Sequence, residues 1–298
     1  MKEVTFEDYR ERILRVLVHI QQSLDEPLSL DELAAVACFS PFHFHRIFRG
    51  LVGESVKEHV RRLRLERAAQ RLRFTGQPVI EIAFDAGYQA PESFARAFHQ
   101  MFGQSPTEFR VTRRTVAYGP APSGVHFATE GKLDGFRPAD RARSLLLVRV
   151  RELPSLRVAF ARHVGPYEQV SAAWSRLMTW AGRRGLFSLP VKTFGILHDD
   201  PEVTAPDKLR YEAAMVVAEE VAAEGEVGIQ QITGGRYAVA THAGPYEQVG
   251  DTYARLCGEW LPLSGRELLS APALEFYRNS PEHTPPEELL TDVWLPLA

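Results

Sequence analysis

Apolar residues recur every three to four positions through much of residues 6–102, a pattern typical of amphipathic helices. The first apolar stripe ends before Pro27, and Ser29 followed by Glu32 is the pattern of a capping box at the start of the next helix. Further helices are predicted at residues 41–52, 55–74, 79–84 and 91–102. This part of the chain is therefore predicted to be all-helical.

A short helix, a tight turn and a second helix occur twice in this segment. The second helix begins at Pro41 and ends at Gly53 in the first copy, and it begins at Pro91 and ends at Gly103 in the other. Each pair is predicted to be a helix-turn-helix unit. The Arg-rich helix at residues 55–74 is long enough to connect the two units.

The outer faces of the two second helices are polar. Helical spacing directs one apolar set in each helix towards the core: Phe44, Ile47, Phe48 and Leu51, and Phe94, Ala97, Phe98 and Met101. The outer faces then carry Phe42, His45, Arg46 and Arg49, and Glu92, Ser93, Arg96, His99 and Gln100. For either helix alone, exposure to solvent would explain the polar outer face as well as DNA binding does. The duplicated unit favours DNA binding, with the two helices in successive major grooves about 34 Å apart.

The apolar pattern changes after the helices. Residues 115–143 are rich in Pro and Gly and lack periodicity, which predicts a linker between domains at 1–114 and 144–298. The last segment alternates β-type runs with two helices and is predicted to be α+β. Its GPYEQV motif occurs twice, 79 residues apart, so we predict two β-helix-β-β repeats related by a pseudo-twofold axis, with a groove between them.

The formal charge of −3 is unevenly distributed. Residues 1–114 carry 17 Lys and Arg against 15 Asp and Glu, whereas the rest of the chain carries 18 against 23. Residues 46–73 hold nine basic and three acidic side chains. Such a segment is suited to neutralising phosphates, although charge alone fits a solvated helix face better.

Several classes of protein are disfavoured. No stretch approaches the roughly 18 apolar residues of a membrane span, and the first residues lack a signal peptide, so a cytoplasmic location is expected. Cys38 and Cys257 lie in apolar helical patterns and are expected to be buried thiols. Without a metal-ligand cluster, a phosphate loop or a Ser-His-Asp spacing, we predict no catalytic residues, no metal site and no cofactor.

One carboxylate interrupts an apolar run in the last segment. Glu275 occupies the position that Gly195 holds in the first repeat. A buried carboxylate needs a partner, so Glu275 either faces solvent or is paired, and a cationic ligand or a hydrogen-bonding substrate is one option. Glu212 and Asp292 are aligned with each other between the repeats, and exposed strand faces are the plain explanation for both.

Aromatic residues are numerous in the same segment. They include Trp174, Trp180, Tyr211, Tyr237, Tyr277 and Trp294. They could form an aromatic box around an organic cation, although core packing explains most of them as well. The repeated motifs add Tyr167 and Tyr246, which are expected to line the groove, while the neighbouring Glu168 and Glu247 are expected mainly to favour a helix N-terminus.

The helical part closely resembles the DNA-binding domain of the AraC/XylS family. The resemblance covers residues 7–113 and rests on LDELAAVACFSPFHFHRIFRGLVGES, RLRLERAAQRL and IEIAFDAGYQAPESFARAFHQMFGQSPTEFR. It implies base contacts from the outer faces of both second helices. The residues at those positions are Phe42, His45, Arg46, Glu92, Ser93 and Arg96.

Residues 145–298 resemble the GyrI-like domain, a ligand-binding fold also found fused to AraC-type regulators. The duplicated GPYE and the ending TDVWLPL carry this resemblance. It implies a central glutamate, matched here by Glu275, that holds lipophilic and often cationic compounds among aromatic rings. The expected ligand-binding residues are Glu275, Tyr277, Glu212, Tyr167, Tyr246 and Trp294.

These features predict a one-component transcription regulator that is not an enzyme. The expected partners are double-stranded promoter DNA, a small-molecule effector and RNA polymerase, with no membrane. One alternative is a C-terminal hydrolase, as in some relatives of the GyrI-like domain, or a ligand scavenger fused to a DNA-binding domain. Another is a module that binds a topoisomerase through an apolar patch.

Overall fold

The computed structural model describes residues 5–112, 118–133, 135–139, 146–187 and 192–298, with the side chain of Phe42 excepted. The chain divides into two compact units. Of the described residues, those from 7 to 139 form the helical unit and those from 146 to 298 form the sheet unit. The predicted combination of a helical domain and an α+β domain is therefore confirmed.

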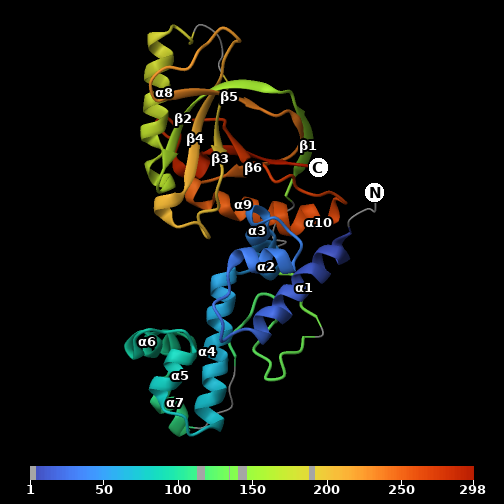
Figure 1. Cartoon of the computed structure of the whole chain (residues 1–298), viewed down its shortest axis with the longest axis vertical. Coiled ribbons are helices and arrows are strands. Elements are labelled where there is room, and N and C mark those ends of the chain that lie inside the picture. The colour runs from blue at the N-terminus through green and yellow to red at the C-terminus, as the bar shows by residue number, and fades with distance from the viewer. Residues whose placement is uncertain (1–4, 113–117, 134, 140–145, 188–191) are drawn as a thin grey trace. The chain divides into compact units, whose positions relative to one another are not determined.

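Seven helices fall in the described residues of the first part of the chain. They are α1 (Phe6–Gln22), α2 (Leu30–Val36), α3 (Pro41–Val52), α4 (Val56–Phe74), α5 (Val79–Asp85), α6 (Pro91–Phe102) and α7 (Pro106–Thr112). Figure 1 shows α4 running from the α2–α3 pair to the α5–α6 pair. The two helix-turn-helix pairs and their connector are therefore confirmed.

Local chemistry sets the ends of these helices. Ser55 begins α4 with a capping box, in which its hydroxyl accepts the Glu58 backbone N–H while the Glu58 carboxylate accepts the Ser55 backbone N–H. Gly53 and Gly103 end α3 and α6 with φ angles of 86° and 71°. Glycine adopts this left-handed conformation without steric cost, so both helices stop where the sequence predicts.

The segment expected to be a linker differs from that expectation in its described residues, which belong to the helical unit. Val125 and Phe136 are buried. The Phe127 backbone N–H donates to the Glu66 carboxylate on α4 at 2.7 Å, and the Ala139 N–H donates to the Leu51 carbonyl on α3 at 2.8 Å. Pro and Gly disrupt periodicity without preventing an irregular segment from packing on a helix.

The sheet unit contains one antiparallel sheet of eight strands in its described residues. The strands are β1 (Val148–Leu153), β2 (Leu156–Val164), β3 (Thr193–Leu197), β4 (Arg210–Val216), β5 (Val227–Ile232), β6 (Gly235–Ala243), β7 (Ala273–Tyr277) and β8 (Leu290–Pro296). Their order is β1-β6-β8-β7-β3-β4-β2-β5. Strands β3 and β7 pair at the centre and place Gly195 opposite Glu275.

Helices cover one face of this sheet. Helix α8 (Ser171–Arg183) packs on β2 and β4, beside which it runs in Figure 1. Helix α9 (Val249–Arg255) packs on β6 and β8 and continues through a π-helical turn at Leu256–Trp260 into α10 (Leu261–Leu263). The opposite face carries a separate apolar cluster with Phe194, Leu274 and Trp294. Successive side chains of a strand point to opposite faces of the sheet, so this cluster is separate from the side chains that pack on the helices.

The two cysteines differ from each other in exposure. Cys257 is buried as expected, but Cys38 is exposed, so the expectation of a buried thiol is wrong for Cys38. Cys38 lies in the turn that follows α2 and has a φ of 53°. The helix ends before Cys38, so the apolar spacing of the preceding residues gives no information on the exposure of the Cys38 side chain.

Candidate functional site

The inner faces of α3 and α6 pack as the helical spacing predicts. Phe44, Phe48, Phe94 and Phe98 are fully buried. In the second unit, Phe98 packs edge-on against Phe109 of α7, with ring centroids 5.3 Å apart. Since each inner face is fixed by aromatic packing, the outer face of each helix is held at a defined rotation.

The outer face of α6 is open to solvent. Glu92 and Arg96 are exposed and Ser93 is half-buried. The Arg96 guanidinium lies 3.4 Å from the Ser93 hydroxyl, which places two hydrogen-bonding groups side by side on one turn of the helix. This group has the composition of a base-reading surface.

The outer face of α3 is less accessible than expected. His45 is 3% exposed and Arg46 is 5% exposed, so the expectation that this face is open fails for both residues. Helical periodicity identifies the face of α3 that packs within its helix-turn-helix unit. It gives no information on the solvent exposure of the opposite face. Arg49 is half-buried, and the side chain of Phe42 lies outside the described residues. DNA contact by these four residues stays a prediction, and for His45 and Arg46 it requires their exposure.

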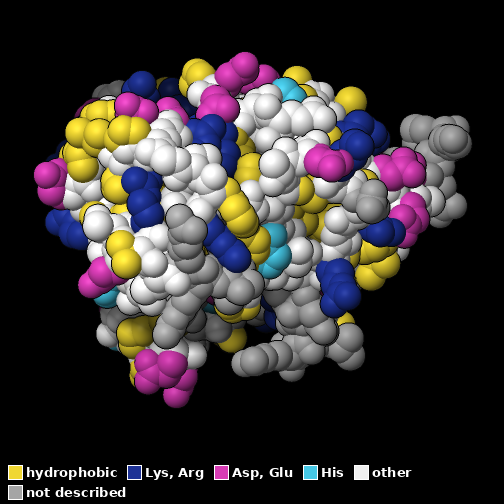
Figure 2. Space-filling model, turned by 90° about the horizontal axis from the view of Figure 1, so that it is seen from below, with side chains coloured by type: hydrophobic (Ala, Val, Ile, Leu, Met, Phe, Trp, Pro, Cys, Tyr) yellow, Lys and Arg dark blue, Asp and Glu magenta, His cyan; other side chains and the backbone are white. Residues whose placement is uncertain are grey.

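Basic side chains do not form one continuous patch on the surface that Figure 2 shows. Lys and Arg side chains are separated there by neutral groups and by Asp and Glu.

A buried charge network fixes the connector helix to the first unit. The Glu54 carboxylate lies 2.7 Å from His59 Nδ1 and 2.6 Å from Arg62 Nη2, and Arg62 also contacts Glu66 at 2.9 Å. Burial alone would raise the pKa of Glu54, but hydrogen bonds from His59 and Arg62 outweigh it and hold the pKa at about 2. The carboxylate therefore stays charged and ties the end of α3 to α4 at neutral pH.

The second candidate site surrounds Glu275 at the centre of the sheet. Glu275 is 6% exposed and accepts two tyrosine hydroxyls, from Tyr253 on α9 and from Tyr277 on its own strand, both at 3.0 Å. Tyr211 on β4 lies 3.1 Å from the Tyr277 hydroxyl, and the Trp174 indole N–H donates to Tyr211 at 2.9 Å. Side chains from both halves of the sheet unit therefore form one hydrogen-bonded chain that ends at this carboxylate.

The direction of this hydrogen-bond chain follows from its ends. Trp174 only donates, and Tyr277 gives its proton to Glu275, so Tyr211 must donate to Tyr277. Burial raises the pKa of Tyr211 and raises that of Tyr277 well above the ordinary tyrosine range. Both hydroxyls consequently stay protonated, so that Tyr277 donates to the Glu275 carboxylate and Tyr211 donates to Tyr277.

The absence of a side chain at Gly195 makes this arrangement possible. A Cβ atom there would lie 2.6 Å from the Tyr211 hydroxyl oxygen and 2.8 Å from the Tyr277 hydroxyl oxygen. Both distances are shorter than side chains tolerate. The glycine that the first repeat places opposite Glu275 therefore provides the space in which the tyrosine hydroxyls meet.

Tyr246 and Tyr167 lie at the edge of this cluster. The Tyr246 ring packs edge-on against Tyr277 at 5.5 Å and is 37% exposed, so it lies between Tyr277 and solvent. Tyr167 packs against Tyr211 at 6.0 Å and donates its hydroxyl to the Asp199 carbonyl. The structure thus brings four of the expected ligand-binding residues together: Glu275, Tyr277, Tyr246 and Tyr167.

Glu212 and Trp294 lie on the opposite face of the sheet. The register pairs Glu275 with Val293, and neighbouring residues of a strand point to opposite faces, so Trp294 points away from Glu275. The exposed strand face expected for Glu212 is also wrong, because Glu212 is fully buried between Arg162 at 2.6 Å and His198 at 3.2 Å. Sequence spacing could not assign these residues to a face without the strand register.

The buried Glu212 is expected to make the stability of the sheet unit pH-dependent. Burial alone would raise its pKa, but hydrogen bonds from His198, Gln230 and Arg162 hold the pKa at about 2, below its ordinary 4.5. Its contribution to stability is therefore complete above about pH 4.5 and is lost as the pH falls to about 2. All four tryptophans lie in the sheet unit, so denaturant unfolding followed by tryptophan fluorescence measures this unit alone.

We expect Glu212→Gln to lower the unfolding midpoint at pH 7 and to flatten its decline between pH 5 and pH 2. Glu219→Gln, at an exposed site, removes the same charge and should leave the pH profile unchanged. An identical profile for Glu212→Gln and the unmodified protein would contradict the assignment.

Tyr253 was missed by sequence reasoning. The repeats contain the signal, because the 79-residue offset aligns Tyr253 with Trp174, so both occupy the same place after their GPYE motifs. Each donates into the central network, Trp174 to Tyr211 and Tyr253 to Glu275. Aligning the helices of the repeats as well as their motifs would have found it.

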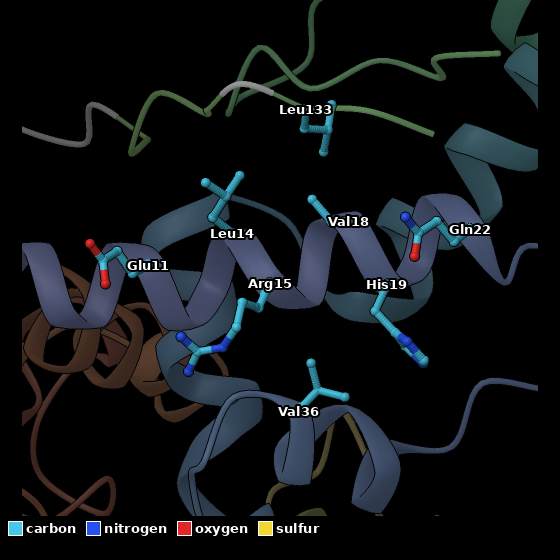
Figure 3. A pocket seen from close by; sticks show the side chains of 8 residues that line it. All are labelled: Glu11, Leu14, Arg15, Val18, His19, Gln22, Val36 and Leu133. Carbon is cyan, nitrogen blue, oxygen red and sulfur yellow. The ribbon is translucent and has the colours of Figure 1, made fainter. Parts of the chain in front are cut away.

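A shallow groove of about 520 Å³ also lies along α1 in the helical unit. Figure 3 shows Leu14 and Val18 pointing towards Leu133, whereas Arg15 and His19 point towards Val36. The side chains lining this groove diverge around the helix instead of converging on one point. We assign no ligand to it.

Two further properties concern the described residues only. No group of three or more His, Cys, Asp or Glu side chains in these residues is arranged to hold a metal ion. None of their helices is both long and apolar enough to cross a membrane.

Comparisons with known proteins match both parts of the chain. The model of the GyrI-like small molecule binding domain matches residues 147–298, and that of a helix-turn-helix domain matches residues 33–112. The probable transcriptional regulator YgiV of Escherichia coli K12 is 34% identical over 154 residues, which cover 51% of this chain and 96% of YgiV.

Two further relatives match about a third of the chain each. The right origin-binding protein of Escherichia coli K12 is 35% identical over 107 residues, which cover 36% of this chain and only 37% of that protein. The regulatory protein SoxS of Salmonella typhimurium is 33% identical over 101 residues, which cover 34% of this chain and 94% of SoxS. The chain therefore belongs to the GyrI-like small molecule binding domain family and carries an AraC-type helix-turn-helix domain in front of that domain.

Proposed function

We propose that this protein is a transcription regulator that reads promoter DNA through α3 and α6 and is modulated by a lipophilic cation bound at Glu275. The observation that carries the ligand assignment is a buried carboxylate held by two tyrosine hydroxyls among aromatic rings. The helix-turn-helix domain matched at residues 33–112 supports the DNA-binding part, and relatives named as regulators support the regulatory role. The base-reading residues would be Phe42, His45, Arg46, Arg49, Glu92, Ser93 and Arg96.

The chemistry of the site favours an organic cation over an anion. Tyr253 and Tyr277 donate to Glu275 and stabilise its charged form, which attracts a positive ligand. Aromatic faces add cation–π attraction of about 0.5–2 kcal/mol for a desolvated cation. Tyr246 is the exposed ring of the cluster, so we propose that it moves aside when a ligand enters.

We also propose that the two halves of the sheet unit are related by a pseudo-twofold axis between β3 and β7. Equivalent hydrogen bonds in both halves support this relation. His163 and His242 each contact the proline carbonyl of the following GPYE motif, at 3.0 Å and 3.1 Å. The axis would place Glu275 at the boundary of the halves, where a ligand would contact both.

This function is tested by measuring whether binding of the ligand changes the affinity of the protein for DNA. The full-length protein is titrated onto a labelled duplex of the DNA upstream of its gene at fixed salt, with and without 1-naphthylmethylammonium as the probe cation. Allosteric coupling energies of about 1–3 kcal/mol predict a change of about 5- to 150-fold in the Kd for this duplex. The neutral analogue 1-naphthylmethanol should change it much less. Specific binding that the cation leaves unchanged would contradict the proposal.

The same preparation separates this function from the hydrolase alternative. Incubation with 1-naphthyl acetate should release no more naphthol than a buffer control. Release of many equivalents that Glu275→Gln abolishes would favour a hydrolase instead.

RNA polymerase remains the expected protein partner, because a regulator at a promoter acts by contacting polymerase or by competing with it.

A further inference from the structure

A second groove lies on the sheet unit, away from the cluster around Glu275. Its volume is about 620 Å³, within the range typical of small-molecule sites. Strands β1, β6 and β8 provide much of its wall, and Figure 1 shows β1 and β6. Helix α9 adds Asp251, Thr252 and Arg255 to the lining. The lining residues on which the argument rests are Arg149, Arg151, Val239, Thr241, Arg278 and Trp294.

The strand register places this wall on the face opposite Glu275. Arg149 pairs with Val239, and Val239 pairs with Trp294, so these three side chains form one row across the sheet. Trp294 follows Val293, which is the partner of Glu275 on the other face. The row therefore combines a guanidinium, an aliphatic side chain and an indole on a surface that Glu275 does not reach.

Arginines outnumber carboxylates among the residues that line this groove, which include Asp251 and Asp292. Arg149 and Arg151 are exposed, and no carboxylate in the described part of the chain pairs with either. Arg278 differs from them, because Asp292 neutralises it at 2.8 Å. The groove thus presents two uncompensated guanidinium groups beside an aromatic surface.

We propose that this groove binds a small aromatic carboxylate. A guanidinium presents N–H groups in a planar fork that matches the two oxygens of a carboxylate. Arg149 or Arg151 would hold the carboxylate, while the aromatic ring of the ligand packs on Val239 and Trp294. The sheet unit then carries two sites of opposite charge preference, and this second site does not depend on the proposed cation site.

Calorimetric titration of the full-length protein with 1-naphthoate tests the groove. We expect saturable 1:1 binding that the double substitution Arg149→Gln and Arg151→Gln weakens at least about 10-fold, because charged hydrogen bonds are lost. Arg183→Gln removes an exposed arginine from α8 and should leave the affinity unchanged. Trp294→Phe should reduce the quenching of tryptophan fluorescence by the ligand.

The probes distinguish this site from the proposed cation site. Glu275→Gln should weaken the binding of 1-naphthylmethylammonium and leave the binding of 1-naphthoate unchanged. The double arginine variant should weaken the binding of 1-naphthoate and leave that of 1-naphthylmethylammonium unchanged. Three results would overturn the proposal: no saturable binding of 1-naphthoate, equal affinity in the double variant, or displacement by acetate at the same concentration, which would indicate a charge effect without recognition of the ring.

Discussion

Replacing Glu275 by glutamine is expected to weaken the binding of 1-naphthylmethylammonium by about 10- to 150-fold, since contacts with a charged group contribute about 1.5–3 kcal/mol. Glutamine keeps the size of the side chain, so the packing of the surrounding aromatic rings should persist. The negative charge that attracts the cation is removed. Because Glu275 is 6% exposed, water screens this charge less than it would at the surface.

Matched ligands and variants isolate the charge effect in this experiment. The affinity for the neutral 1-naphthylmethanol should differ little between Glu275→Gln and the unmodified protein. Glu219→Gln removes one exposed carboxylate from the same unit and controls for net charge. If calorimetry gives equal cation affinities for Glu275→Gln and the unmodified protein, the assignment of Glu275 as the cation ligand is wrong.

Arg96→Ala is expected to reduce specific DNA binding by about 1–3 kcal/mol relative to nonspecific binding, as for the loss of a base contact. Arg96 is exposed on α6, beside Ser93, and the inner face of its helix is held by Phe94 and Phe98. The substitution should therefore leave the fold intact. The measurement is fluorescence anisotropy with a duplex selected from a random pool and with a scrambled duplex, at the same salt concentration.

An arginine on another helix provides the control for Arg96. Arg15 is exposed on α1, so Arg15→Ala makes the same change in charge without altering the outer face of α6. We expect it to affect the selected and scrambled duplexes alike. An equal loss of affinity on both duplexes with Arg96→Ala would identify Arg96 as a phosphate contact that does not read bases.

The architecture was predictable because its signals are local. The cap at Ser29, whose hydroxyl accepts the Glu32 backbone N–H, the glycines at positions 53 and 103 and the helical spacing of Phe94 and Phe98 depend only on neighbours a few residues away. The change to alternating apolar residues likewise identified the second domain. Glu275 stood out because a carboxylate inside an apolar run is costly in any fold.

Accessibility and the faces of the sheet needed the tertiary structure. His45 and Arg46 have the spacing of an open outer face, yet both are buried. Glu212 and Trp294 were expected beside Glu275, yet strand register places them on the other face, because one residue along a strand reverses the direction of a side chain.

The sequence by itself therefore determined the two domain types, the helix boundaries near their caps and the special status of Glu275. Only the tertiary structure decided that Tyr253, Tyr277 and Tyr211 meet at Glu275 and that Arg149 lies in a row with Trp294. Helix ends depend on contacts within a few residues. These clusters instead join strands and helices far apart in the chain, whose pairing no local pattern specifies.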